Sequence, residues 1–191
     1  MPARQRESLL RSIFTEDNKA LITLPPRNDT ETEIFSEWNF PGGLLKFEGQ
    51  EFGFPEGFHA EVSVQWLESE ALLLAGISVN AVIEAECARC LKAVSLEISG
   101  KLMYLYCSQD PQTIEDDEYM PVEIEHFGRV LDVMPQIEES IYTLIPTKIL
   151  CREDCKGLCP NCGADLNDGE CSCKNENIDP RLEALRKFTT E

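Results

Sequence analysis

Cysteine spacing constrains this chain more than any other feature. Six of its nine cysteines lie between Cys151 and Cys173, in the segment CREDCKGLCPNCGADLNDGECSC. They form three close pairs, with three, two and one residues between partners: Cys151 and Cys155, Cys159 and Cys162, Cys171 and Cys173. Thiolates two or three residues apart can face one ion across a tight turn, and four sulfurs complete the tetrahedron that Zn²⁺ prefers. The sequence therefore predicts a metal-binding module.

A fourth pair, Cys87 and Cys90, lies far upstream in ECARCL. Four pairs are the number needed for two sites of four thiolates, and Cys107 is left over. Chain reach favours one partition, because the loop between Cys162 and Cys171 is long enough for the last two pairs to close on one ion. The first site would then hold Cys87, Cys90, Cys151 and Cys155, and the second Cys159, Cys162, Cys171 and Cys173.

The rival partition groups Cys151 and Cys155 with one of the neighbouring pairs and leaves the upstream pair with the rest. It requires a more crowded loop, because Cys155 and Cys159 are only four positions apart. We expect two structural Zn²⁺ ions. An iron–sulfur cluster is the alternative, although its usual Cys-x2-Cys-x2-Cys spacing is absent. A redox pair at Cys87 and Cys90 would need a helix N-terminus, which the strand pattern around it does not predict.

Charge limits the class of partner. The chain has 191 residues and a formal net charge of −18, so at long range it should repel nucleic acid and anionic membranes. The acidic excess lies before residue 146, and the remainder is nearly neutral. We expect the acidic body to suit a basic protein partner, unless the charge serves solubility alone. The tail holds candidate contacts to a partner or to RNA: Lys156, Lys174, Arg181, Arg186 and Lys187.

The N-terminal residues do not resemble an export signal, since they lack an apolar run and a small-residue cleavage site. The longest apolar stretch, 71–79, is too short to span a bilayer. We therefore expect a cytoplasmic protein without a membrane partner. In that compartment, clustered cysteines indicate metal binding more than disulfides.

Hydrophobic periodicity predicts an α+β fold: a mainly antiparallel β-sheet with a packed helix, a cysteine-rich zinc-binding tail and a short terminal helix. Apolar residues alternate through 58–106, which predicts about three long strands, with Cys87 and Cys90 in a hairpin connection. Helical spacing predicts a helix at about 131–145, with Pro135 in its first turns, and a second at 179–188. We expect three parts: a polar N-terminal arm over 1–32, the β domain over 33–150 and the zinc module with its helix over 151–191.

Other patterns are less specific. The aromatic residues of 33–58 could stack on bases, but their acidic neighbours favour core packing. The acidic run 115–118 could bind a cation and is more typical of a solvated loop. His126 has no nucleophile nearby and is interpreted as structural. Sites closed by four sulfurs leave no open position for catalysis. We therefore predict that the protein is not an enzyme and expect no small-molecule substrate.

The motifs ECARCLKAV, LIP, CREDCKGLCPNCGADLN and IDPRLEALRKF, in this order, resemble the YceD family of bacterial proteins, which is named for accumulation of large-subunit ribosomal RNA. The resemblance covers roughly residues 80–188. It implies a cytoplasmic, non-enzymatic factor in large-subunit RNA processing and ribosome assembly. Its partner would be pre-ribosomal large-subunit RNA or a basic ribosomal protein. The acidity favours an alternative, a structural zinc protein that acts as a protein–protein adaptor without direct RNA contact.

Overall fold

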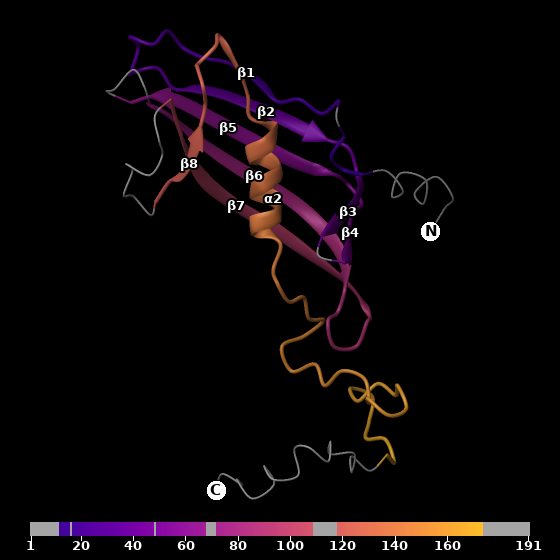
Figure 1. Ribbon diagram of the computed structural model, residues 1–191. Helices are drawn as coiled ribbons and strands as arrows, with labels where there is room; N and C mark the ends of the chain where they lie inside the picture. The colour runs from indigo at the N-terminus through magenta and orange to yellow at the C-terminus, as the bar shows by residue number, and fades with distance from the viewer. Residues whose placement is uncertain (1–11, 16, 48, 68–71, 109–117, 174–191) are drawn as a thin grey trace, which may run out of the picture. The chain divides into compact units, whose positions relative to one another are not determined.

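The computed structural model describes residues 12–15, 17–47, 49–67, 72–108 and 118–173. They belong to two compact units: Met1–Ala85 with Val94–Thr147, and Glu86–Ala93 with Lys148–Glu191. The first unit holds a β-sheet with a helix (Figure 1). The second unit holds eight of the cysteines. This confirms the predicted α+β class with a mainly antiparallel sheet. The predicted boundaries at residues 32 and 150 stay predictions.

Seven strands form the larger sheet, in the order β2-β5-β6-β4-β3, with β7 pairing β6 and β8 pairing β7. The β7–β8 pairing is parallel, whereas the pairings β2–β5, β3–β4, β4–β6 and β5–β6 are antiparallel. The strands of this sheet are β2 Ile34–Phe40, β3 Gly43–Phe47, β4 Gln50–Phe54, β5 Phe58–Trp66, β6 Leu72–Glu86, β7 Ala93–Cys107 and β8 Met120–Glu123. Strands β1 Leu21–Thr23 and β9 Val130–Asp132 form a separate antiparallel pair.

The three long strands predicted from alternation are β5, β6 and β7. In the β5–β6 ladder, which runs from Phe58 opposite Ala81 to Trp66 opposite Leu73, apolar side chains alternate with polar ones. Val62 and Ile77 lie on the buried face, whereas the other face carries polar residues such as Glu61. A period of two matches the pleat, so one face of the sheet is apolar and needs a cover.

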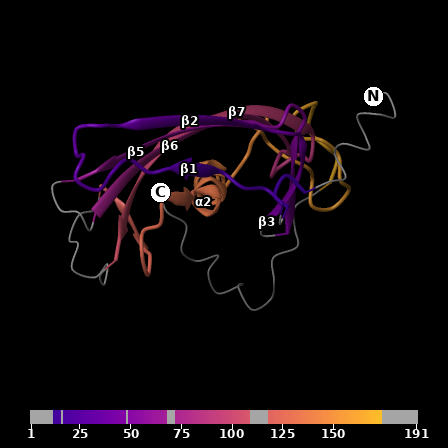
Figure 2. The same ribbon diagram turned by 90° about the horizontal axis from the view of Figure 1, so that it is seen from above.

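Helix α2, Met134–Leu144, covers the apolar face, and the sheet curves around it (Figure 2). Met134, Ile137 and Ile141 are buried at helical spacing. The Tyr104 hydroxyl lies 3.1 Å from the Gln136 carbonyl oxygen, to which it donates, and 3.0 Å from the Ser140 hydroxyl. The helix starts three residues after the predicted residue 131, because Leu131 belongs to β9. Proline is tolerated in the first turn, where Pro135 lies, since its missing N–H would have no helical partner.

Residues of the predicted N-terminal arm pack against this core. Ala20 and Ile22 are buried, and β1 pairs with β9. The Trp66 indole N–H donates to the Pro25 carbonyl oxygen at 2.9 Å. Arg27 lies over the rings of Trp66 and Phe127, with distances of 5.8 and 5.7 Å to the ring centroids. Tertiary contacts thus order a segment that lacks periodicity of its own.

Core packing is confirmed for four of the aromatic residues in 33–58: Phe40, Phe52, Phe54 and Phe58. Phe40 and Phe58 stack with their centroids 4.4 Å apart. The predicted terminal helix and residues 115–117 of the acidic run lie outside the described residues, whereas His126 is exposed. None of the helices in the described part of the chain combines the length and apolarity that crossing a bilayer requires.

Two glycines provide a matched test of packing in the sheet unit. Gly57 and Gly49 have the same φ of 79°, but a Cβ at Gly57 would lie 1.9 Å from the Phe40 carbonyl oxygen, whereas one at Gly49 would meet nothing within 4 Å. We expect Gly57→Ala to lower the free energy of unfolding by about 3 kcal/mol, and Gly49→Ala by about 1 kcal/mol. Urea unfolding of both variants would check this, and equal losses would contradict it.

Candidate metal centres

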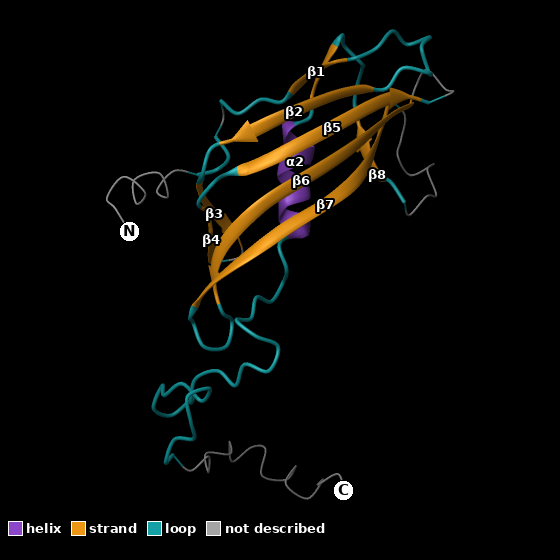
Figure 3. Ribbon diagram, turned by 180° about the vertical axis from the view of Figure 1, so that it is seen from behind, coloured by secondary structure: helices purple, strands orange, loops and turns teal. Residues whose placement is uncertain are grey.

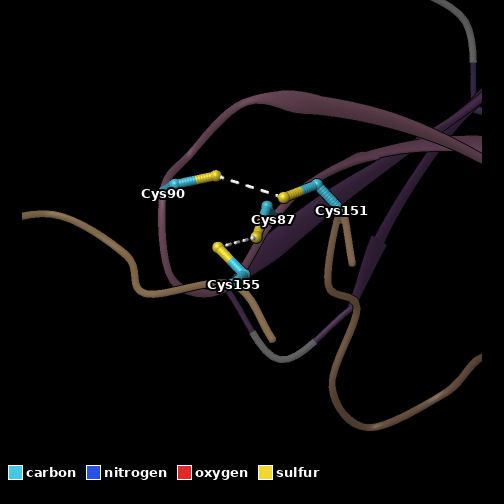
Figure 4. A group of neighbouring side chains, drawn as sticks. All are labelled: Cys87, Cys90, Cys151 and Cys155. Carbon is cyan, nitrogen blue, oxygen red and sulfur yellow. Dashed lines mark hydrogen bonds between the residues drawn. The ribbon is translucent and has the colours of Figure 1, made fainter. Parts of the chain in front are cut away.

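The second unit brings together the sulfurs of Cys87, Cys90, Cys151 and Cys155, which we call the hairpin cluster. The Cys87 and Cys155 sulfurs are 3.8 Å apart and those of Cys90 and Cys151 are 3.6 Å apart. All four sulfurs lie within 4.8 Å of one another and point inward (Figure 4). A disulfide needs about 2.05 Å, whereas sulfurs bound to one tetrahedral zinc ion lie about 3.8 Å apart. The spacing therefore fits a shared ion.

Local backbone turns aim the first two sulfurs of the hairpin cluster. After β6, the Leu91 N–H donates to the Cys87 carbonyl oxygen at 2.9 Å, and the Cys87 N–H donates to the Lys92 carbonyl oxygen at 2.8 Å. Leu91 has a φ of 59°, in the left-handed region that favours glycine. The chain thus reverses within this turn, and both cysteines lie on its inner side, where they are buried.

Arg89 joins the two segments that form the hairpin cluster. Its guanidinium donates to the Cys155 carbonyl oxygen at 2.6 Å, and its own carbonyl oxygen accepts from the Leu158 N–H at 3.1 Å. A Cβ at Gly157 would lie 2.9 Å from that carbonyl oxygen, and Gly157 has a φ of 77°. Glycine is needed at 157 because the backbone of residue 89 approaches so closely.

Asn167 is not a candidate ligand, but its side chain forms a hydrogen bond with one sulfur of the hairpin cluster. Its Nδ2 donates to the Cys155 sulfur at 3.4 Å and to Asp165 Oδ1 at 2.6 Å, while its Oδ1 accepts from the Lys156 N–H at 2.8 Å. Lys92 pairs with Asp165 at 2.6 Å, and this hydrogen bond is the main reason that the pKa of Asp165 is lowered to about 2. Partners of this kind orient ligands and restrain the site.

The second group, which we call the tail cluster, consists of Cys159, Cys162, Cys171 and Cys173, whose sulfurs also lie within 4.8 Å of one another. It repeats the turn of the hairpin cluster, since the Gly163 N–H donates to the Cys159 carbonyl oxygen at 2.9 Å and Gly163 has a φ of 73°. Cys159 is buried, whereas Cys162 and Cys173 are exposed. The tail cluster is therefore the more open of the two.

Thiols within the hairpin cluster differ in how readily they ionise. Burial acts to raise the pKa of Cys87, but the N–H groups of Arg89, Cys151 and Cys90 lower it to about 6. Hydrogen bonding with Cys90, followed by burial, raises the pKa of Cys151 to about 12. Burial acts to raise the pKa of Cys155 too, but hydrogen bonds from Asn167 and the Gly157 backbone lower it. Negative charge therefore forms more readily at Cys87 and Cys155 and is opposed at Cys151. A divalent cation removes that opposition because it attracts all four thiolates.

Apolar packing is sparse in the described part of the second unit. The buried residues there are four cysteines, one aliphatic residue and one glycine: Cys87, Cys90, Cys155, Cys159, Ile149 and Gly157. A segment with so little apolar surface to bury usually needs a cross-link or a metal to fold. The donor set, the sulfur spacing and the small core all fit structural zinc, although the identity of the metal stays a prediction.

The structure thus groups the eight cysteines as chain reach favoured, and not as in the rival partition. Cys107 lies outside both clusters, buried in β7, with its sulfur 3.7 Å from the Val122 carbonyl oxygen. Of the predicted partner contacts, Lys156 is exposed beside the hairpin cluster. The other four, Lys174, Arg181, Arg186 and Lys187, lie outside the described residues.

Sequence reasoning missed the residues that support the hairpin cluster, because their partners are distant in the chain: Arg89, Lys92, Asp165 and Asn167. The run Asp165-Leu166-Asn167-Asp168 carried a signal, since Asp and Asn favour turns in which their side chains bond to nearby backbone. The Asn167 N–H indeed donates to Asp165 Oδ1 at 2.9 Å. The sequence of this turn did not indicate which cysteine sulfur it would contact.

The first unit is a mainly antiparallel sheet with a helix, and the second unit contains two clusters of four cysteines. These features define an α+β protein with a candidate metal-binding module. The chain belongs to the YceD family, because the model of that family, described as large ribosomal RNA subunit accumulation protein YceD, matches residues 75–189. The matched region contains all eight clustered cysteines.

Several curated proteins are similar to this chain. An uncharacterized protein of Mycobacterium tuberculosis is 37% identical over 121 residues, which cover 61% of this chain and 55% of the relative. The large ribosomal RNA subunit accumulation protein YCED homolog 1 of Arabidopsis thaliana, a chloroplastic protein, is 25% identical over 155 residues (66% and 47%). YlbN of Bacillus subtilis, also uncharacterized, is 36% identical over 105 residues (53% and 58%).

The chain thus spans about half the length of the curated relatives that it matches. No solved structure matches it significantly.

Cysteine variants test whether each cluster holds its own ion. We expect Cys87→Ser and Cys171→Ser each to remove one of two zinc equivalents per chain, because a missing thiolate opens only its own cluster. Cys107→Ala, outside both clusters, should keep both equivalents. Elemental analysis of the purified proteins would measure this. Loss of both ions in Cys171→Ser, or a brown protein with iron, would contradict the assignment.

The role of Asn167 can be separated from that of the ligands. We expect Asn167→Ala to weaken zinc binding at the hairpin cluster by roughly tenfold, because the Cys155 sulfur loses a donor that fixes its orientation. Competition with a chromophoric chelator would measure the affinity. Asn161→Ala, at an exposed asparagine in the turn of the tail cluster, serves as the control, and an equal effect would show that Asn167 has no special role.

Proposed function

We propose that this protein is a non-enzymatic zinc-binding factor that acts in the cytoplasm and supports the accumulation of large-subunit ribosomal RNA, and hence ribosome assembly. The observation that carries this proposal is the family match over residues 75–189, which includes both cysteine clusters. The chloroplastic relative from Arabidopsis thaliana is itself named for large ribosomal RNA subunit accumulation.

Zinc would have a structural role in this factor. In the hairpin cluster, Cys87, Cys90, Cys151 and Cys155 would occupy all four positions of a tetrahedral ion, which leaves none for a substrate or a reactive water. The same holds for the tail cluster. When bound, zinc would supply folding free energy to a unit that buries little apolar surface. This supports a binding role over catalysis.

The partner would be pre-ribosomal large-subunit RNA or a basic ribosomal protein. Lys156 would be one contact to phosphate, since its side chain is exposed next to the hairpin cluster. The formal net charge of −18 opposes RNA binding over most of the chain. This charge supports the second candidate function, an adaptor that binds proteins without touching RNA.

Removal of the gene from its host should test the proposed function. We expect the ratio of large-subunit to small-subunit ribosomal RNA to fall, with large-subunit precursors accumulating in sucrose gradients. The wild-type gene should restore the ratio, whereas a Cys87→Ser/Cys155→Ser variant, expressed at a matched level, should not. An unchanged ratio in the deletion strain would refute the proposed function. If the ratio falls, crosslinking of the protein to RNA in the complemented strain would distinguish an RNA-binding factor, which crosslinks, from a protein–protein adaptor, which does not.

A further inference from the structure

The face of the large sheet that points away from α2 is not covered by any described element of the first unit (Figure 3). It carries the outward residues of β2, β5, β6 and β7. Those of β2 and β5 are Phe35, Glu37, Asn39, His59, Glu61, Ser63 and Gln65. A sheet normally buries one face and wets the other, so polar residues here are expected. Their arrangement is not uniform, however.

Two carboxylates lie directly opposite each other on this face. Glu37 on β2 pairs in register with Glu61 on β5, and both are exposed. Like charges in a direct cross-strand pair are destabilising. The next pair along the ladder is Asn39 with His59. Ligand atoms of Glu37, His59 and Glu61 lie within 4.8 Å of one another, so the negative charge is concentrated at one point of the sheet.

Both ring nitrogens of His59 face oxygen atoms at this point. Its Nδ1 lies 2.9 Å from Asn39 Oδ1, and its Nε2 lies 3.3 Å from Glu61 Oε1. Whichever ring nitrogen of His59 donates, the carboxylates of Glu37 and Glu61 keep further lone pairs, and N–H donors from outside can satisfy them. A group with several N–H donors and a positive charge fits this place.

Basic residues are scarce on the strands that form this face. Strands β2, β5, β6 and β7 contain no arginine and one lysine, Lys101. Lys101 lies beside Gly76 and Ser63 and forms no ion pair with Glu37 or Glu61 in the described part of the chain. A hollow of about 260 Å³ next to His59 is also acidic, since Glu56 and Glu97 line it together with Asn39 and Asn80.

An aromatic ring completes the surface. Phe35 is 71% exposed and lies on the same face as Glu37, two positions earlier in β2. Most large apolar side chains on this sheet are buried, so Phe35 is an exception that folding does not explain. A guanidinium group can stack on such a ring while its five N–H donors bind carboxylates in a planar fork.

We propose that the uncovered sheet face around Phe35, Glu37, His59 and Glu61 is a docking surface for an arginine-containing basic segment of a protein partner. Charge complementarity identifies the occupant, because the same face repels the phosphates of RNA. The proposal deepens the partner part of the proposed function and rests on that function for the kind of partner, a basic protein. It does not involve the cysteine clusters.

Peptide binding to the full-length, zinc-loaded protein would test this surface. The probe is a fluorescein-labelled peptide of six Arg-Gly repeats, and the matched peptide carries citrulline in place of arginine. We expect the arginine peptide to bind measurably tighter than the citrulline peptide by fluorescence anisotropy. Glu37→Gln/Glu61→Gln should weaken binding of the arginine peptide by roughly tenfold. Absence of binding to the wild-type protein, or no preference for arginine, would overturn the proposal.

The matched control is Glu123→Gln/Glu125→Gln, which removes two exposed carboxylates of the same unit elsewhere. It should change the affinity less than about twofold, whereas equal weakening would mean general attraction to an acidic protein and would reject the surface. The midpoint of thermal unfolding should not fall in Glu37→Gln/Glu61→Gln, because the substitutions remove a like-charge pair. This measurement separates lost docking from lost folding.

Two further outcomes would assign the face to another ligand and so reject the proposal. One is a third zinc equivalent that disappears in Glu37→Gln/Glu61→Gln. The other is binding of a labelled single-stranded RNA that this variant weakens. The test is also independent of the cellular role. If peptide binding fails while gene deletion still lowers large-subunit RNA, the docking surface is wrong and the proposed function stands.

Discussion

Convergence of sulfur atoms is the constraint on which the second unit depends. Its described residues bury a single aliphatic side chain, Ile149, together with four cysteines. The hydrophobic core among these described residues is therefore very small, and the thiols occupy the place that a larger core would have. Four thiolates in one place repel one another unless a cation lies between them. The fold of this unit and the metal binding that we propose for it would in this sense be one property.

The sheet unit is stabilised by a hydrophobic core, and the connection between two of its strands carries one cysteine pair. Alternating apolar residues in β5, β6 and β7 create one buried face, and α2 covers it with Met134, Ile137 and Ile141. Strands β6 and β7 are consecutive in the chain and pair with each other, so a short hairpin connects them. That connection carries Cys87 and Cys90. The hairpin thus carries two candidate ligands whose partners lie some sixty residues later, since Cys151 comes 61 positions after Cys90.

The surfaces that we propose for recognition differ in charge between the two units. The uncovered sheet face is acidic around Glu37 and Glu61, whereas Lys156 lies exposed in the cysteine unit. A protein with this division can bind a basic partner through one unit and leave the other for a polyanion. Together with membership of the YceD family, this is compatible with the role that we propose, support of the accumulation of large-subunit ribosomal RNA.

Local patterns in the sequence determined much of this protein. Spacings of two and of 3.6 residues predicted the long strands and α2, and close cysteine pairs predicted turns that aim two sulfurs at one point. The length of the loop between Cys162 and Cys171 favoured the same division of the cysteines into two clusters that the structure shows. Tertiary structure alone decided that β1 joins β9, that Asn167 donates to Cys155, and that Glu37 faces Glu61. These contacts join residues whose register depends on how separate strands and loops pack, and no local pattern encodes that register.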